Sequence, residues 1–259
     1  MTRLGYRLRL ALPWLMVALF AVGVTLVAML PAGWVTPQFA QRTGGRIVLA
    51  DPAGSLWHGS ATLRLAAGVD SGEPTELPGR LEWHTAFWPL LAGRIRMTLS
   101  QTEAMPAPVE LIATQREATL GSGSLMVPAG LLDGLGAPFN TLALRGDVRL
   151  QWTDWRIFGQ RAFGHLTVTL SDIVSRVSRV KPLGTFRVVF DAQGEAGTLG
   201  LNTLKGPLLL DGQGSLQDHR FVFSGSARAE PAVAENLRPL LDLLGHQSPD
   251  GSYALTLDR

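Results

Sequence analysis

Residues 165–171 read HLTVTLS and residues 185–191 read TFRVVFD, and in both stretches apolar and polar side chains alternate. In the first stretch Leu166, Val168 and Leu170 alternate with histidine, threonine and serine residues. Successive side chains of a β-strand point to opposite faces, so a period of two predicts a strand with one apolar and one polar face.

The same period recurs on both sides of these stretches, at residues 57–65, 94–99, 147–153 and 220–228. Short segments rich in glycine or proline separate the alternating stretches at hairpin spacing. One apolar face per strand is typical of an antiparallel sheet, whereas parallel strands are apolar throughout and alternate with helices. We therefore predict a mainly β fold of roughly ten to thirteen antiparallel strands.

Helical signals are few. Residues 32–42 and 127–135 favour short helices. Residues 231–244 favour a longer helix because four leucines recur there at helical spacing, and a final strand is expected over residues 252–257.

These helices are too few to cover the apolar faces of so many strands, so the sheet must curl or fold onto itself. The expected architecture is a large curled antiparallel sheet, either half-barrel or sandwich-like. Full closure fills the interior with packed side chains, which is the simpler expectation. Partial closure leaves an apolar trough that can hold acyl chains.

The N-terminal region has a different character. No charged residue lies between Arg9 and Arg42, and residues 10–29 are mostly apolar. About 20 residues at 1.5 Å each span a hydrocarbon core of about 30 Å, so residues 10–30 predict a single transmembrane helix. The residues that mark this anchor are Leu10, Trp14, Phe20, Leu26 and Leu30.

Arginines precede the apolar segment of residues 10–30, and the next basic residue, Arg42, lies more than ten residues beyond it, which sets the expected orientation of the segment. Residues 1–9 are predicted to form a cytoplasmic tail and residues 31–259 a periplasmic β domain. A cleaved signal peptide is the alternative. Its apolar region is usually about 7–15 residues long, and no clear cleavage site follows the longer run present here.

Composition and motifs argue against several classes of function. The formal net charge is only +2, without the basic cluster that nucleic-acid binding requires. The absence of cysteine excludes disulfides, thiolate metal sites and a cysteine nucleophile. The histidines are far apart in the sequence, and His58 and His165 are expected to be solvated on polar faces. No phosphate-binding loop, dinucleotide motif or nucleophile elbow occurs. We expect no catalytic residue, metal ion or cofactor, and no enzymatic activity.

Two groups of side chains leave alternatives open. Four tryptophans either line a ligand site or, in the case of Trp83 and Trp152, pack in the core from apolar faces; the four are Trp83, Trp88, Trp152 and Trp155. Arginines on polar faces either bind lipid headgroups and partner carboxylates or, more simply, protect the sheet from edge pairing. These arginines are Arg64, Arg94, Arg96, Arg149 and Arg187.

Three stretches carry a resemblance to a known family: LPAGWV at residues 30–35, TGGRIVLADPAGSLWHGSATLRL at residues 43–65 and KPLGTFRV at residues 181–188. Their order, with one N-terminal anchor, resembles the type II secretion system protein N (general secretion pathway protein N) family over essentially the whole chain. The family-like motif residues are Gly54, Leu56, Trp57, Gly59, Pro182, Leu183 and Gly184. We call residues 54–59 the first family-like motif and residues 182–184 the second. The first, GSLWHG, is also similar, more weakly, to AsmA-like inner-membrane proteins associated with lipid transport.

The resemblance implies a non-enzymatic component of the inner-membrane platform of the type II secretion system, which exports folded proteins across the outer membrane. It implies a location in the bacterial inner membrane and contact with other secretion-system subunits. The alternative, motivated by the excess of one-sided strands, is a periplasmic lipid-binding or lipid-bridging module with an apolar groove. Neither interpretation involves nucleic acid or a cofactor.

Overall fold

The computed structural model describes residues 23, 25, 29–34, 36–66, 75–135, 139–217, 220–249 and 251–258. The predicted transmembrane helix over residues 10–30 lies almost entirely outside this part of the chain, as do its marker residues Leu10, Trp14, Phe20 and Leu26. Among the described residues, no helix combines the length and the apolar character needed to cross a membrane.

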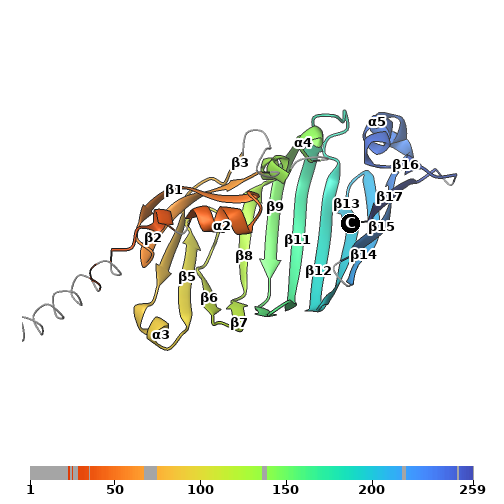
Figure 1. The fold of residues 1–259 in the computed structure, drawn as a ribbon. Coiled ribbons are helices and arrows are strands. Elements are labelled where there is room, and N and C mark those ends of the chain that lie inside the picture. Colours follow the sequence, from red (N-terminus) through yellow and green to blue (C-terminus); the bar gives the residue numbers. More distant parts are fainter. Residues whose placement is uncertain are drawn as a thin grey trace, which may run out of the picture.

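The described strands form one antiparallel sheet of seventeen members (Figure 1). Its first half contains β1 (Ile47–Gly54), β2 (His58–Leu65), β3 (Thr75–Glu76), β4 (Leu81–Thr85), β5 (Ile95–Gln101), β6 (Val109–Ala113), β7 (Glu117–Leu120) and β8 (Gly123–Pro128). Its second half contains β9 (Leu144–Trp152), β10 (Trp155–Phe158), β11 (Arg161–Ser175), β12 (Gly184–Gly194), β13 (Ala196–Lys205), β14 (Leu208–Gln217), β15 (Arg220–Ala229), β16 (His246–Gln247) and β17 (Tyr253–Asp258).

The predicted antiparallel, mainly β fold is confirmed, but seventeen strands exceed the number expected from the sequence. Two long strands are interrupted, one into β7 and β8 and the other into β9 and β10, and β11 pairs with both β9 and β10. The strands β3 and β16 are only two residues long, which is too short for a visible alternation of side chains.

The sheet is open rather than closed. Each ladder is antiparallel and joins strands that follow one another along the chain or flank a short insertion. The end strand β1 pairs with β2 and the end strand β17 pairs with β15 and β16, so within the described residues the two ends do not meet. The sandwich-like alternative is therefore wrong, and the curled, half-barrel alternative describes the sheet.

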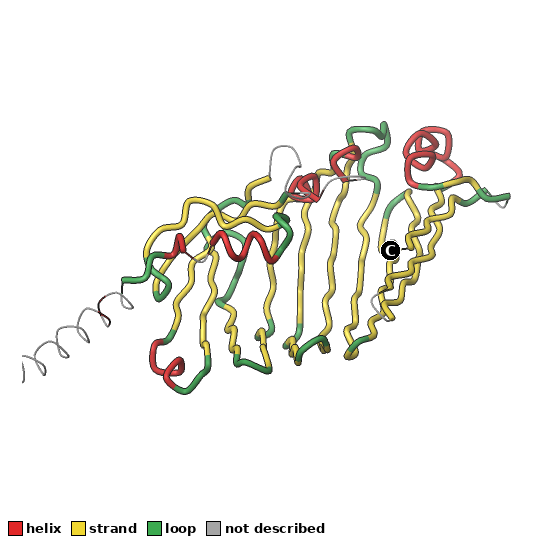
Figure 2. The backbone as a smooth tube through the Cα atoms, viewed as in Figure 1, coloured by secondary structure: helices red, strands yellow, loops and turns green. Residues whose placement is uncertain are grey.

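Short helices lie mainly along one rim of the sheet (Figure 2). They are η1 (Ala32–Trp34), α2 (Thr36–Arg42), α3 (Phe87–Leu91), η2 (Ala129–Leu135), α4 (Phe139–Leu142), η3 (Pro231–Val233) and α5 (Ala234–Leu244). The helices predicted over residues 32–42, 127–135 and 231–244 are confirmed to within a few residues, as is the final strand. The sequence pattern does not predict α3 or α4. The helix α3 lies apart from the others, at the outer end of the β4–β5 hairpin (Figure 1).

The buried core follows the rim that carries η2, α4 and α5. Leu237, Leu240 and Leu241 of α5 are buried in it, and strands contribute their rim-side residues, such as Leu144 of β9 and Phe186 of β12. Further from the helices, apolar residues of the strands remain only half-buried; they include Leu166, Phe190, Leu199, Phe221 and Phe223. The helices therefore cover one rim and leave much of the apolar sheet surface without a second layer.

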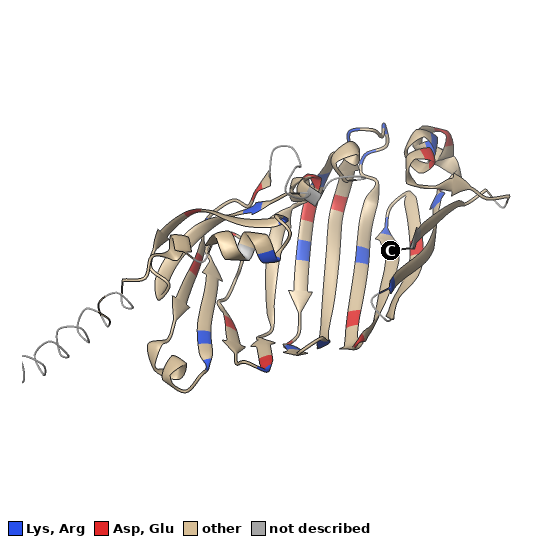
Figure 3. Cartoon of the chain, in the orientation of Figure 1, with Lys and Arg blue, Asp and Glu red and all other residues tan. Residues whose placement is uncertain are grey.

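Charged side chains of both signs are interspersed along the strands (Figure 3). Arg149 of β9 and Arg187 of β12 are exposed, as expected for positions that alternate with apolar ones. This distribution is typical of a solvated sheet surface and not of a binding surface for a polyanion.

Candidate functional site

The first family-like motif forms a tight turn between β1 and β2. The Ser55 N–H donates to the His58 carbonyl at 2.8 Å, and the His58 N–H donates back to Ser55 Oγ at 3.2 Å. Gly54 has a φ of 80°, a conformation that favours glycine, and a Cβ there would collide with the His58 carbonyl. A Cβ on Gly59 would lie only 2.6 Å from Ser55 O and 2.6 Å from Trp83 Cε2. A side chain at either motif glycine would therefore collide with the backbone of the turn, which explains why glycine occupies both positions.

Tryptophans cover glycines on neighbouring strands. Trp83 lies on Gly59 and Trp152 lies on Gly123, and each pair is directly opposite in its antiparallel ladder. Each indole N–H donates to a backbone carbonyl of an adjoining loop, at 3.2 Å for Trp83 and 2.8 Å for Trp152. Both tryptophans are half-buried and lie outside the buried core, so the prediction that they pack in it is wrong. They fill the space that a glycine leaves on the sheet surface.

Loop 55–57 of the first motif contacts the C-terminal end of the predicted transmembrane segment, residues 10–30. The Leu56 N–H donates to the Leu30 carbonyl at 2.9 Å, and Pro31 forms an isolated antiparallel bridge with Ser55. Leu30 is the one predicted anchor residue that the structure describes. The motif therefore determines where this segment joins the sheet.

The same loop also contacts the hairpin that carries α3. The Thr85 N–H donates to the Trp57 carbonyl at 2.7 Å, and Thr85 Oγ1 donates to the Leu56 carbonyl at 2.9 Å. The Trp57 and Phe87 rings meet edge to face with centroids 5.3 Å apart. Sequence reasoning missed this junction because α3 is short and uncharged; the local sequence FWPLL, with two adjacent aromatic residues, is the only signal.

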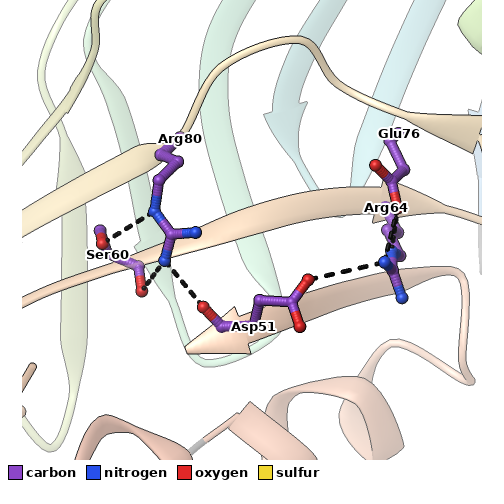
Figure 4. Close-up of polar contacts among 5 residues, drawn as sticks. All are labelled: Asp51, Ser60, Arg64, Glu76 and Arg80. Atoms are coloured by element: carbon purple, nitrogen blue, oxygen red, sulfur yellow. Dashed lines mark hydrogen bonds and ion pairs between the residues drawn. The ribbon is translucent and has the colours of Figure 1, made fainter. Parts of the chain in front are cut away.

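A polar cluster surrounds a bulge in β1 close to the motif (Figure 4). The register between β1 and β2 shifts at residues 50–53, where Asp51 has a φ of 47°. Arg80 donates to the Asp51 carbonyl at 2.7 Å and to Ser60 Oγ at 3.1 Å. Arg64 donates to Glu76 at 2.7 Å. These exposed side chains hold the bulge against β2, so we assign the cluster a structural role.

The histidines do not form a metal site in the described part of the chain. His58 and His84 are cross-strand partners with ring centroids 4.1 Å apart, and His165 Nδ1 lies 2.5 Å from Asp191 Oδ1. No group of three or more histidine, aspartate or glutamate residues in the described ranges is arranged to hold a metal ion.

The second family-like motif lies at the start of β12. The peptide bond before Pro182 is cis, Leu183 is buried, and Gly184 has a φ of 154° with the Lys205 carbonyl only 2.6 Å from where a Cβ would be. The two motifs are not brought together, because strands β4–β7, β10 and β11 lie between β2 and β12 in the ladder order. The second motif therefore contributes to a different part of the molecule.

The second family-like motif borders a half-open apolar cavity of about 410 Å³ between the sheet and the rim helices. All of its lining residues are aliphatic or aromatic, and they include Leu170, Leu183, Phe186, Val188, Leu201 and Leu240. The volume is at the lower end of the range for sites that hold small molecules, about 300–1,000 Å³. The cavity has no polar group that could perform chemistry, so its lining suits a hydrocarbon chain.

Tyr253 of β17 packs beneath α5 beside this core and is 4% exposed. Burial raises the pKa of its hydroxyl above the ordinary value, and a hydrogen bond to Asp242 acts in the same direction. The hydroxyl therefore stays protonated to a higher pH than that of an exposed tyrosine.

Comparison with known families finds a match. The model of the family "Type II secretion system (T2SS), protein N" matches residues 45–256, from just before β1 into β17. No curated protein and no solved structure matches the chain. The weaker similarity to AsmA-like proteins therefore has no support from the comparisons.

Proposed function

The chain belongs to the type II secretion system protein N family, and on this premise we propose that it is a non-enzymatic component of the inner-membrane platform. The family is associated with the secretion apparatus at the inner membrane, and membership implies contact with other secretion-system subunits. In the proposed arrangement residues 1–9 are cytoplasmic, residues 10–30 cross the membrane and the sheet is periplasmic. The observation that carries the proposal is the family match, which extends from before β1 into β17.

The C-terminal edge of the sheet is a suitable contact surface for another subunit. Strand β17 pairs with β15 along one side, but on its other side β16 pairs only with Tyr253 and Ala254. Within the described residues, the outer backbone groups from Leu255 onward have no partner strand. An edge of this kind can accept a strand from another protein. The opposite edge is less accessible because α2 packs against β1.

Photo-cross-linking in cells tests the platform role. A photoreactive amino acid at Thr256, which is exposed on β17, is expected to capture other secretion-system subunits. The matched control is Asn202, which is exposed on β13 in the interior of the sheet and should capture fewer. Recovery of no secretion-system subunit at either position, with normal export of folded proteins in a deletion strain, would overturn the proposal.

The apolar cavity favours a second candidate function, the binding of a lipid acyl chain. The cavity lies where the rim helices stand over the sheet, and half-buried apolar residues continue beyond it. A chain of methylene groups can use this surface without leaving any polar group unpaired. The motivating observation is separate from the family match, so the two functions can coexist.

Two valines of β12 provide a matched test of lipid binding. Val188 lines the cavity, whereas the adjacent Val189 lies on the other face, and both are half-buried. Val188→Phe fills part of the cavity and is expected to reduce the phospholipid that co-purifies with the full chain from detergent, measured by native mass spectrometry. Val189→Phe should leave it unchanged. Equal lipid content in the two variants and the parent, or no lipid in any of them, would refute this function.

A further inference from the structure

The outer end of the β4–β5 hairpin exposes large apolar side chains. Trp88 is 78% exposed and Leu91 is 71% exposed, and Phe87 beside them is also exposed. We call these three residues of α3 the aromatic tip. A soluble surface rarely leaves adjacent large apolar residues so accessible, and such groups usually mark an interaction site.

Hydrogen bonds connect the aromatic tip to the end of the uncharged N-terminal segment. Loop 55–57 is bonded to Leu30 and Pro31 on one side and to Thr85, just before α3, on the other. Trp34, four residues after Leu30, is itself 70% exposed. The exposed aromatic residues thus belong to the same end of the sheet as the point where the uncharged segment leaves it.

Charge around the aromatic tip suits a surface of anionic lipid. No acidic residue occurs in the sequence between Glu82 and Glu103, and α3 is followed directly by the exposed Arg94. Arg96 is also exposed but pairs with Glu110 of the neighbouring strand at 3.0 Å, so Arg94 is the positive charge that bears on the argument. Tryptophan is favoured at the headgroup level of a bilayer, and basic residues near an anionic leaflet are attracted to it.

We propose that the aromatic tip lies in the headgroup region of the lipid bilayer, so that the sheet rests on the membrane surface through α3 and Trp34. The partner of this surface is the bilayer itself. The inference rests on the proposed function, because the bilayer concerned is the one that residues 10–30 are proposed to cross. It goes further by giving the domain a second membrane contact and hence a defined orientation.

The chain has no cysteine, so single cysteines can be placed and spin-labelled without background. Leu91→Cys reports on the aromatic tip. Leu243→Cys is the control, because Leu243 is an exposed leucine, 53% accessible, on α5 at the other end of the sheet. Phe20→Cys reports separately on the predicted transmembrane helix. Each full-length variant is reconstituted into vesicles of phosphatidylethanolamine and phosphatidylglycerol, and collision rates with oxygen and a nickel chelate are compared.

We expect the oxygen-to-nickel collision ratio at residue 91 to be several-fold higher than at residue 243, with the ratio at residue 20 higher still. A ratio at 91 equal to that at 243 overturns the inference, whatever residue 20 reports. If residue 20 is lipid-exposed while residue 91 is aqueous, the proposed topology survives and the second contact does not exist. If residue 20 is aqueous and residue 91 is lipid-exposed, the topology fails but the aromatic tip is a membrane contact by itself.

Discussion

Substitution of Gly59 by alanine examines whether the first family-like motif is a packing device. The added Cβ would be placed 2.6 Å from Ser55 O and closer still to the nearest atom of the Trp83 ring. Ser55 O accepts a hydrogen bond from the Trp83 indole N–H, so neither the carbonyl nor the ring can move away from the added methyl group without disturbing that bond. We therefore expect Gly59→Ala to destabilise the fold, although replacing glycine by alanine inside a strand normally stabilises a protein.

The size of the effect follows from two opposing contributions. Overpacking of a methyl group against a constrained neighbour costs about 1–3 kcal/mol. Replacing glycine by alanine at a permitted conformation returns about 0.5–1 kcal/mol by restricting the unfolded chain. The middle of each range gives a net loss of about 1 kcal/mol in the free energy of unfolding, which for a chain of this size corresponds to a Tm lowered by roughly 2–4 °C.

Thermal unfolding of the full chain in detergent, followed by circular dichroism, measures this change. Gly200→Ala is the matched control, because Gly200 also lies within a strand and a Cβ there meets no atom within 4 Å. Its Tm should stay the same or rise slightly. If Gly59→Ala is as stable as Gly200→Ala, the steric account of the motif is refuted.

A double-mutant cycle with Trp83→Leu tests whether the indole ring, which would contact the added methyl group and also donates a hydrogen bond to Ser55 O, contributes to the strain. If the indole ring causes part of the strain, the two substitutions couple by about 0.5 kcal/mol or more. If only Ser55 O matters, the effects of Gly59→Ala and Trp83→Leu add, and the ring is not part of the constraint.

Other substitutions have expected outcomes that follow directly from burial and hydrogen bonding. Leu237→Ala removes a fully buried α5 side chain and should lower the free energy of unfolding by about 2–5 kcal/mol, whereas Leu243→Ala should change it by less than about 0.5 kcal/mol; chemical denaturation of both tests whether α5 anchors the core. Arg80→Met removes the hydrogen bonds across the β1 bulge and should lower the free energy of unfolding by about 1 kcal/mol. An unchanged midpoint of chemical denaturation would mean that the backbone maintains the bulge without Arg80. Because burial raises the pKa of Tyr253, the folded state holds this proton more tightly than the unfolded state does, so the stabilisation is present below pH ~10 and is lost as the pH rises further. Tyr253→Phe should therefore flatten the alkaline decline of Tm, and an identical decline in both proteins would contradict this reasoning.

The alternation of side chains by itself determines that the chain forms strands, that each strand has one apolar face and that the strands pair in antiparallel fashion. The first two are local properties, because the direction of a side chain depends on its own position along the strand. The antiparallel pairing follows less directly, because parallel strands are buried on both faces and would be apolar throughout. The leucine spacing of residues 231–244 likewise predicts α5, since four leucines on one helical face have only one favourable way to be buried.

Only the tertiary structure decides how the sheet is shaped and what its motifs do. Whether the sheet is open or closed depends on the strand twist accumulated over many ladders and on where short helices can pack. Neither can be predicted from a single stretch of sequence. The same holds for the junction at Leu56, where Leu30 and Thr85 both bond to the backbone of one loop, and the alternation of apolar and polar side chains does not predict these hydrogen bonds. The two family-like motifs look alike in sequence, as glycine-containing turns before strands. The fold separates them, because one closes a hairpin beside the uncharged segment and the other borders the apolar cavity.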